Sequence, residues 1–129
     1  MLFGTAVVTG GMLIWPLFSR LFTGSVAQVG ALEAVQLMNR RDAIVLDVRD
    51  AADYAAGHIA NARNIPFAQL NDRLRELEKF KSRPVIISGE SGTRAAKACA
   101  ALQKIGFGDV FALRGGLRGW VEASLPVEK

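Results

Sequence analysis

Residues 84–94 read PVIISGESGTR and join an apolar run, a glycine-rich loop and the start of a helical pattern. The run at 84–88 is the most apolar strand candidate in the chain, which predicts a buried parallel strand. Residues 93–105 predict a helix, and Gly106 is placed to end it. Because ligands of open α/β sheets bind at the carboxyl ends of the strands, this stretch predicts both the fold class and the position of a binding site.

The alternation of strands and helices extends outward from this stretch. Further strands are predicted at 43–48, 62–66 and 109–113, and helices at 31–38, 51–56, 70–80 and 117–123. Asp50 is placed to cap the helix at 51–56 with its side chain, and Gly57 to end it. Short apolar strands that alternate with helices indicate βαβ units. We therefore predict an α/β fold at 31–129, a single domain whose parallel sheet is covered by helices on both faces.

The composition limits the class of function. The chain has 129 residues, enough for one domain of ordinary size, and a net charge of +4. The basic residues at 73–83 alternate with acidic ones, and Phe80 is the single aromatic residue among them. This pattern indicates a solvated helix face, and nucleic-acid binding is not expected. The alternative to a solvated face is that the excess of basic over acidic residues in this segment contacts anionic lipid headgroups. The single cysteine, Cys99, excludes an internal disulfide and a multi-cysteine zinc site. We predict no metal and no cofactor.

Residues 1–19 (MLFGTAVVTGGMLIWPLFS) contain no charged side chain. As a helix they rise about 28 Å, close to the ~30 Å thickness of the hydrocarbon core of a bilayer. We therefore predict a transmembrane anchor at 1–22 and a linker at 23–30. Arg20, Arg40 and Arg41 follow the span. By the positive-inside rule, the protein is then expected to cross the inner (cytoplasmic) membrane once, with its domain in the cytoplasm.

Three alternatives to the anchor remain open for this segment. Ser25, Val26 and Ala27 form a small-x-small pattern, which is typical of the cleavage site of a secretory signal peptide, although no basic residue precedes the apolar run. A buried core helix is the second alternative, although a cap and an amphipathic face are both missing. A disordered leader is the third.

The loop at 89–94 has the features of an anion-binding loop, formed by Gly89, Glu90, Ser91, Gly92, Thr93 and Arg94. A glycine-rich turn that opens a helix aims backbone N–H groups at one point, next to the positive end of the helix dipole. The fork of Arg94 suits an oxyanion or the carbonyls of the loop. Many glycine-rich turns of this kind are purely structural, so the pattern alone leaves both interpretations open. The charge of Glu90 opposes an anion, and we expect this side chain to point to solvent.

Five motifs occur in the order and spacing of one known family. They are residues 44–49 (IVLDVR), 53–59 (DYAAGHI), 62–66 (ARNIP), 106–107 (GF) and 115–120 (GGLRGW). On these motifs the chain, from Leu32 to Pro126, closely resembles the rhodanese (sulfurtransferase) family. With its apolar N-terminal segment it is similar to the membrane-anchored single-domain members of bacteria.

The resemblance also exposes a departure in the loop. In the family the loop reads Cys-x-x-Gly-x-Arg, and Gly92 and Arg94 match its glycine and arginine. The cysteine would fall at position 89, where this sequence has Gly89. In active members the thiolate of that cysteine takes the outer sulfur of thiosulfate and holds it as a persulfide. Glycine has no nucleophile, so this covalent chemistry is not expected here.

No other side chain is expected to replace the missing thiol. Ser88 is predicted to point off the other face of the strand, and Cys99 to be a small core residue of the helix that follows. The resemblance implies structural hydrogen bonds for His58, a structural role for Asp47 and a place on the rim of the site for Arg49.

Two functions follow from these observations. The first is a domain of sulfurtransferase descent that carries no persulfide and acts as an anion- or partner-binding module at the membrane. Its expected partners are a small sulfur-containing anion such as thiosulfate, or a membrane protein. The alternative is a thiosulfate-type sulfurtransferase whose active-site cysteine was replaced at Gly89 by a laboratory substitution. From Gly89 to Arg94 the loop has the length found in sulfurtransferases, whereas phosphatases of related fold have a loop one residue longer.

Overall fold

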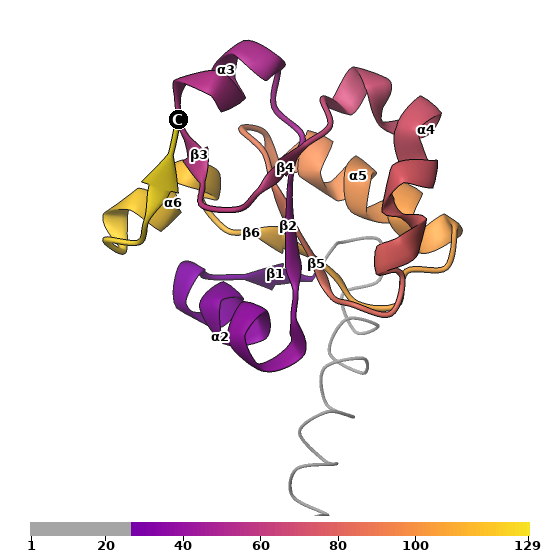
Figure 1. The fold of residues 1–129 in the computed structure, drawn as a ribbon, viewed down its shortest axis with the longest axis horizontal. Helices are drawn as coiled ribbons and strands as arrows, with labels where there is room; N and C mark the ends of the chain where they lie inside the picture. Colours follow the sequence, from indigo (N-terminus) through magenta and orange to yellow (C-terminus); the bar gives the residue numbers. More distant parts are fainter. Residues whose placement is uncertain (1–26) are drawn as a thin grey trace, which may run out of the picture.

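The computed structural model describes residues 27–129, which form one α/β domain (Figure 1). Its strands are β1 Gln28–Val29, β2 Ile44–Asp47, β3 His58–Ile59, β4 Arg63–Asn64, β5 Val85–Ser88, β6 Val110–Leu113 and β7 Val127–Glu128. Its helices are α2 Ala31–Arg41, α3 Ala51–Ala56, α4 Leu70–Arg73, α5 Gly92–Lys104 and α6 Gly116–Glu122, with the 3₁₀ segments η1 Phe67–Gln69 and η2 Leu74–Phe80. Except for the helix at 70–80, the predicted strands and helices are thus confirmed in kind, with ends that shift by a few residues.

Five parallel strands form the main sheet, in the order β1-β6-β5-β2-β4. The most apolar strand, β5, lies in the middle and pairs with β2 from Ile44↔Val85 to Asp47↔Ser88. This register places the last residues of β2 and β5 side by side. The loops that follow the two strands, at 48–50 and 89–91, therefore start from the same edge of the sheet.

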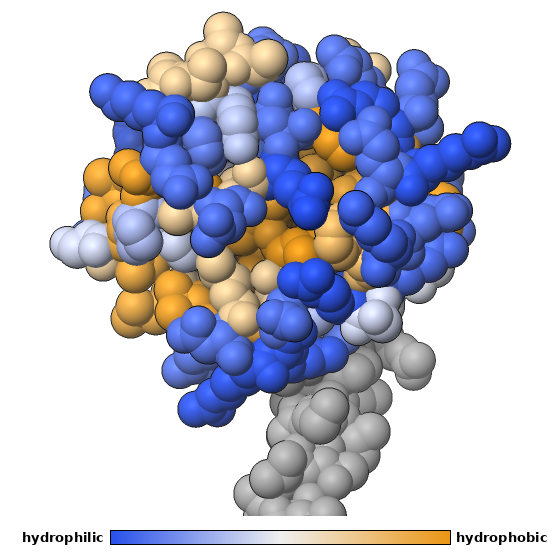
Figure 2. Space-filling view, viewed as in Figure 1, coloured by the Kyte–Doolittle hydropathy of each residue, from blue (hydrophilic) through white to orange (hydrophobic). Residues whose placement is uncertain are grey.

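Apolar side chains cover both faces of the sheet, as predicted. On one face Ile87 packs in a core with α4, η2 and α5, and on the other Ile86 packs in a core with α2 and α6. Neighbouring residues of a strand point to opposite faces, so the unbroken apolar run of β5 serves both cores. Figure 1 shows these helices on the two sides of the sheet, with α3 beyond the carboxyl ends of the strands. In the same view, hydrophilic residues cover most of the surface, and apolar ones show between them (Figure 2).

The predicted linker at 23–30 is wrong at its C-terminal end. Gln28 and Val29 form β1, which pairs with Ala112 and Leu113 of β6, and Val29 is completely buried. A strand of two residues is too short to show a periodic pattern in the sequence, whereas its pairing protects an otherwise open edge of the sheet.

The predicted helix at 70–80 is divided into α4 and η2, with η1 in front of it. Leu77 and Phe80 are buried, and their separation of three residues aligns side chains on one face of a 3₁₀ helix. The cap predicted at Asp50 is confirmed in position, without the side-chain hydrogen bond. Asp50 occupies the N-cap position of α3, but its side chain accepts no capping hydrogen bond.

The predicted anchor at 1–22 lies outside the described residues. Within residues 27–129, no helix is both long enough and apolar enough to cross a membrane.

Candidate functional site

The loop between β5 and α5 has the strand-loop-helix geometry that the sequence predicts. Ser91 is the N-cap of α5, and its Oγ accepts a hydrogen bond of 3.3 Å from the backbone N–H of Arg94. This cap satisfies one of the free N–H groups of the first turn and fixes the direction in which the helix leaves the loop. Gly92 and Thr93 belong to that first turn and are exposed.

A pocket of about 370 Å³ opens beside this loop. Four of the predicted loop residues line it, namely Gly89, Glu90, Ser91 and Arg94, together with the predicted rim residue Arg49. The remaining lining comes from Val48, Asp50 and Asp53. Gly92 and Thr93 are not among the lining residues, so the loop contributes its first three residues and Arg94, and the rest of the wall comes from the chain that follows β2.

Asp47 holds Arg49 in place at the floor of this region. The carboxylate of Asp47 accepts hydrogen bonds from the backbone N–H, Nε and Nη2 of Arg49, at 2.7–3.0 Å. Nη2 of Arg49 also donates to the carbonyl of Gly57 at 2.7 Å, which connects the end of β2 to the end of α3. These hydrogen bonds and the neighbouring charges raise the pKa of Arg49 above its usual value. Asp47 therefore fixes the guanidinium of Arg49, which lines the pocket.

The charge of the pocket differs from that expected for an anion site. Glu90 is exposed, as predicted, but it stands on the rim with Asp50 and Asp53. The charge of Arg49 is already balanced by Asp47, which leaves the exposed Arg94 as the one unpaired cation among the lining residues. Three carboxylates around one free arginine disfavour a small dianion. No metal cluster explains them, since no three His, Cys, Asp or Glu side chains within residues 27–129 are arranged to hold a metal ion.

Sequence reasoning missed Asp50 and Asp53 as site residues. Both follow β2 in the sequence and lie far from the loop at 89–94. The parallel pairing of β2 with β5 carries them to the pocket. The sequence contained a signal for them, since two carboxylates follow a predicted strand at the sheet edge where the loop begins. This pattern could have predicted their place at the pocket.

Position 89 has room for a small side chain. A Cβ built on Gly89 would lie 3.2 Å from Cγ2 of Val48 and 3.9 Å from Cβ of Ala95. The first distance requires a shift of a few tenths of an ångström, and the second is an ordinary contact. The backbone on the other side of this residue is closely packed, because a Cβ on Gly116 would lie 2.6 Å from the carbonyl oxygen of Gly89. Glycine at the start of α6 is thus what lets that helix approach the loop.

The other candidate side chains lie where the sequence predicts them. Ser88 is buried and follows Ile86 on the face of β5 opposite to Gly89. His58 makes structural contacts near the end of α3: its Nδ1 lies 2.8 Å from the carbonyl oxygen of Tyr54, and the two rings stack. Neither residue lines the pocket.

Cys99 is completely buried in α5, as predicted, and burial raises the pKa of its thiol to about 12. The thiolate is therefore absent near neutral pH, and we expect iodoacetamide to leave native Cys99 unmodified while it modifies the unfolded chain rapidly. A time course followed by mass spectrometry, with and without urea, measures this. Rapid modification of the native chain would contradict the burial.

The same shift predicts how stability depends on pH. The pKa of Cys99 is raised in the folded chain, so its contribution to stability is complete below the ordinary thiol value of 9.0 and is lost as the pH rises toward 12. Cys99→Ala is the matched control. Urea unfolding between pH 8 and pH 11 is expected to show a loss of stability that is smaller in the variant than in the unchanged chain.

These features define an α/β domain with a glycine-rich loop and a pocket at the carboxyl edge of a parallel sheet. A model of the rhodanese-like domain matches residues 31–123, and the chain belongs to this family. Among curated proteins, the chain is 38% identical over 106 residues to the uncharacterized protein YibN of Escherichia coli, which covers 81% of this chain and 74% of YibN. It is 36% identical over 92 residues to a sulfurtransferase of Allochromatium vinosum, over 71% of this chain and 84% of that protein.

Solved structures agree with this assignment. A rhodanese-related protein of Thermoplasma volcanium is 27% identical and superposes with a TM-score of 0.69, over 79% of this chain and 97% of that one. A thiosulfate sulfurtransferase of Pseudomonas aeruginosa is also 27% identical, with a TM-score of 0.71, over 81% of this chain and 20% of that one. The resemblance drawn from the five sequence motifs is thereby confirmed for the family and for the fold.

Proposed function

We propose that this protein is a rhodanese-like binding module that carries no persulfide. The observation that supports the proposal is Gly89, which stands at the end of β5, beside the pocket, at the position where the family motif has its nucleophile. The only thiol of the chain, Cys99, is buried on α5 and does not line the pocket. The chain therefore offers no accessible group that accepts a sulfur atom.

The charges around the pocket support one of the two ligand classes that the sequence suggests. A free anion such as thiosulfate would have to approach Asp50, Asp53 and Glu90 with only Arg94 to attract it. A protein partner presents charges of both signs and can match this arrangement. We therefore favour a partner protein at the membrane over a small sulfur-containing anion.

A thiosulfate:cyanide assay of the full-length protein tests the absence of persulfide chemistry. We expect no thiocyanate above the background without protein, both for the unchanged chain and for Cys99→Ala, and no gain of one sulfur atom in the mass of either. Turnover that survives in Cys99→Ala would overturn the proposal, because that variant has no thiol.

Titration with thiosulfate tests the preference for a partner. Calorimetry of the full-length protein should detect weak or no binding, and Glu90→Gln should strengthen it, because the substitution removes one of the three opposing carboxylates. Tight binding that Arg94→Gln abolishes would instead identify the pocket as an anion site.

The membrane is the second part of the proposal and rests on the sequence of residues 1–19. We expect the full-length protein to stay in the membrane pellet during alkaline and high-salt extraction, because an uncharged span of this length partitions into lipid. A chain that begins at Ala27, which removes the apolar segment and keeps β1, is the comparison and should be released. Recovery of the full-length protein in the soluble fraction without detergent, or an N-terminus at Gln28, would contradict the anchor.

A further inference from the structure

Three cationic side chains gather around the ring of Phe80, away from the candidate site. The guanidinium carbon of Arg63 lies 4.5 Å from the ring centroid, and that of Arg83 lies 5.2 Å from it. Nζ of Lys79 also lies 5.2 Å from the centroid. All three distances are within the range of a cation–π interaction.

None of these three cations forms an ion pair within the described residues 27–129. Asn61, which lies beside the cluster, contacts the carboxylate of Glu128. That carboxylate accepts a hydrogen bond of 3.0 Å from the backbone N–H of Asn61 and faces His58, so it does not pair with the three cations. Positive charges that are gathered without a carboxylate repel one another, and an anion bound between them removes that repulsion. The cluster is therefore charged as an anion site would be.

Arg63 and Arg83 line the same small pocket, of about 150 Å³, together with Phe80. The pocket lies beside Ile44 and Val45 of β2, because β4 pairs only with the last two residues of that strand and leaves the earlier edge open. No acidic residue is among those that line the pocket. It thus combines two guanidinium groups, a space beside them and no acidic lining residue.

The two arginines are also held in place before any ligand binds. Both guanidinium groups lie over the ring of Phe80, which is buried, and Nε of Arg83 donates to the carbonyl oxygen of Asp42 at 2.7 Å. This bond occupies Nε and leaves both terminal nitrogens of Arg83 for a ligand. A guanidinium group that is already oriented loses less conformational entropy when it binds an oxyanion through its fork of N–H groups.

We propose that the pocket between Arg63 and Arg83 binds a phosphate group. A phosphate carries enough negative charge and enough acceptor oxygens for both guanidinium groups, and the ammonium of Lys79 adds to the attraction. The group comes either from a soluble phosphate or from the headgroup of an anionic phospholipid. This site is separate from the loop at 89–94, so it does not depend on the proposed function.

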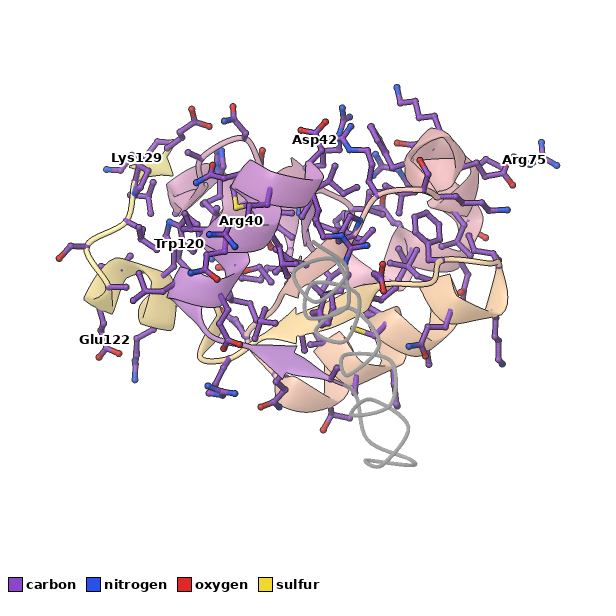
Figure 3. All side chains as sticks on the ribbon, turned by 90° about the horizontal axis from the view of Figure 1, so that it is seen from below. Arg40, Asp42, Arg75, Trp120, Glu122 and Lys129 are labelled. Atoms are coloured by element: carbon purple, nitrogen blue, oxygen red, sulfur yellow. The ribbon has the colours of Figure 1, made fainter. Side chains whose placement is uncertain are left out.

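Modification of arginines by phenylglyoxal tests the proposal on the full-length protein. In a mild non-ionic detergent, inorganic phosphate is compared with sodium chloride at equal ionic strength. In vesicles, phosphatidylcholine alone is compared with phosphatidylcholine that contains phosphatidylglycerol. Peptide mass spectrometry then gives the rate at each arginine. Arg75 is the internal reference, because it is exposed and its side chain points away from the domain (Figure 3).

We expect modification of Arg63 and Arg83 to slow about fivefold relative to Arg75 when phosphate is present at about four times its Kd. Slowing by inorganic phosphate identifies a soluble source. Slowing only in vesicles with phosphatidylglycerol identifies a lipid headgroup. The proposal would be overturned if the rates at Arg63 and Arg83, each divided by the rate at Arg75, were the same in every medium. Equal slowing at all three arginines is one form of this result.

Two variants make the result specific. In Arg63→Gln the protection of Arg83 should be lost, because one of the two guanidinium groups is missing, while near-UV circular dichroism confirms that the chain still folds. In Arg118→Gln, which removes the same charge from an exposed position on α6, the protection of Arg63 and Arg83 relative to Arg75 should be unchanged. Protection of Arg83 that persists in Arg63→Gln would contradict a shared site.

Discussion

Gly89→Cys should convert the chain into one that forms a persulfide. In thiosulfate, the variant is expected to gain the mass of one sulfur atom and then to transfer that sulfur to cyanide. The rate of thiocyanate formation should exceed the background without protein, which is also the rate expected with the unchanged chain, by on the order of 100-fold or more, since the chemistry depends on the nucleophile. In the first step the Cys thiolate attacks the outer sulfur of thiosulfate, and sulfite leaves with the electron pair of the broken S–S bond. Cyanide then takes the outer sulfur as thiocyanate and restores the thiolate.

The structure gives two reasons to expect this gain. A Cβ at position 89 meets only Cγ2 of Val48 closely, at 3.2 Å, so the side chain is accommodated by a small shift. The new thiol also precedes Ser91, the N-cap of α5, by two residues. The positive end of a helix dipole favours a thiolate nearby and lowers the pKa of a cysteine placed there.

Matched variants separate the thiol from the space that it fills. Gly89→Ser adds the same Cβ and a hydroxyl, and it should fold like Gly89→Cys without forming a persulfide. Combining Gly89→Cys with Glu90→Gln should lower the KM for thiosulfate, because one carboxylate on the rim is removed. Val48→Ala relieves the close contact at position 89. If Gly89→Cys folds but forms no persulfide even in combination with Val48→Ala, the loop lacks more than the cysteine of a sulfurtransferase loop.

The strand, loop and helix at 84–105 were predictable because the information is local. A run of apolar residues, a glycine-rich turn and a helical period occur in one stretch, and the structure follows them from Val85 to Lys104. The burial of Cys99 and the orientation of Ser88 followed from the same periodicities. Local patterns thus predicted the loop that lines the pocket and the buried position of the only cysteine.

Other parts depend on pairings between distant segments. β1, β3 and β7 have two residues each and exist because of their partners, which no periodic pattern reveals. The pairing of β3 with β7 brings His58 opposite Glu128. The acidic rim of the pocket likewise depends on the register of β2 with β5. For this reason the loop sequence predicted an anion site, whereas the assembled pocket disfavours a small anion.

Asp47→Ala should destabilise the domain by about 3–5 kcal/mol, because it leaves the buried charge of Arg49 without its partner. Asp47 is 1% exposed, and its carboxylate accepts the backbone N–H and two side-chain nitrogens of Arg49. Urea unfolding, followed by the fluorescence of Trp120 in a Trp15→Phe background, measures the loss. Trp120 is 2% exposed and, of the two tryptophans, the one inside the described domain.

A double-mutant cycle distinguishes the lost ion pair from a simple loss of packing. Asp47→Ala with Arg49→Met removes both charges, so it should be less destabilised than the sum of the single variants by at least about 1 kcal/mol. Additive losses would show that the two side chains act independently. Arg49 also donates to the carbonyl of Gly57 at the end of α3 and lines the pocket. Loss of Asp47 is therefore expected to loosen the part of the pocket wall that carries Asp53. The negative charge that disfavours a small anion at the pocket thus depends on the buried ion pair between Asp47 and Arg49.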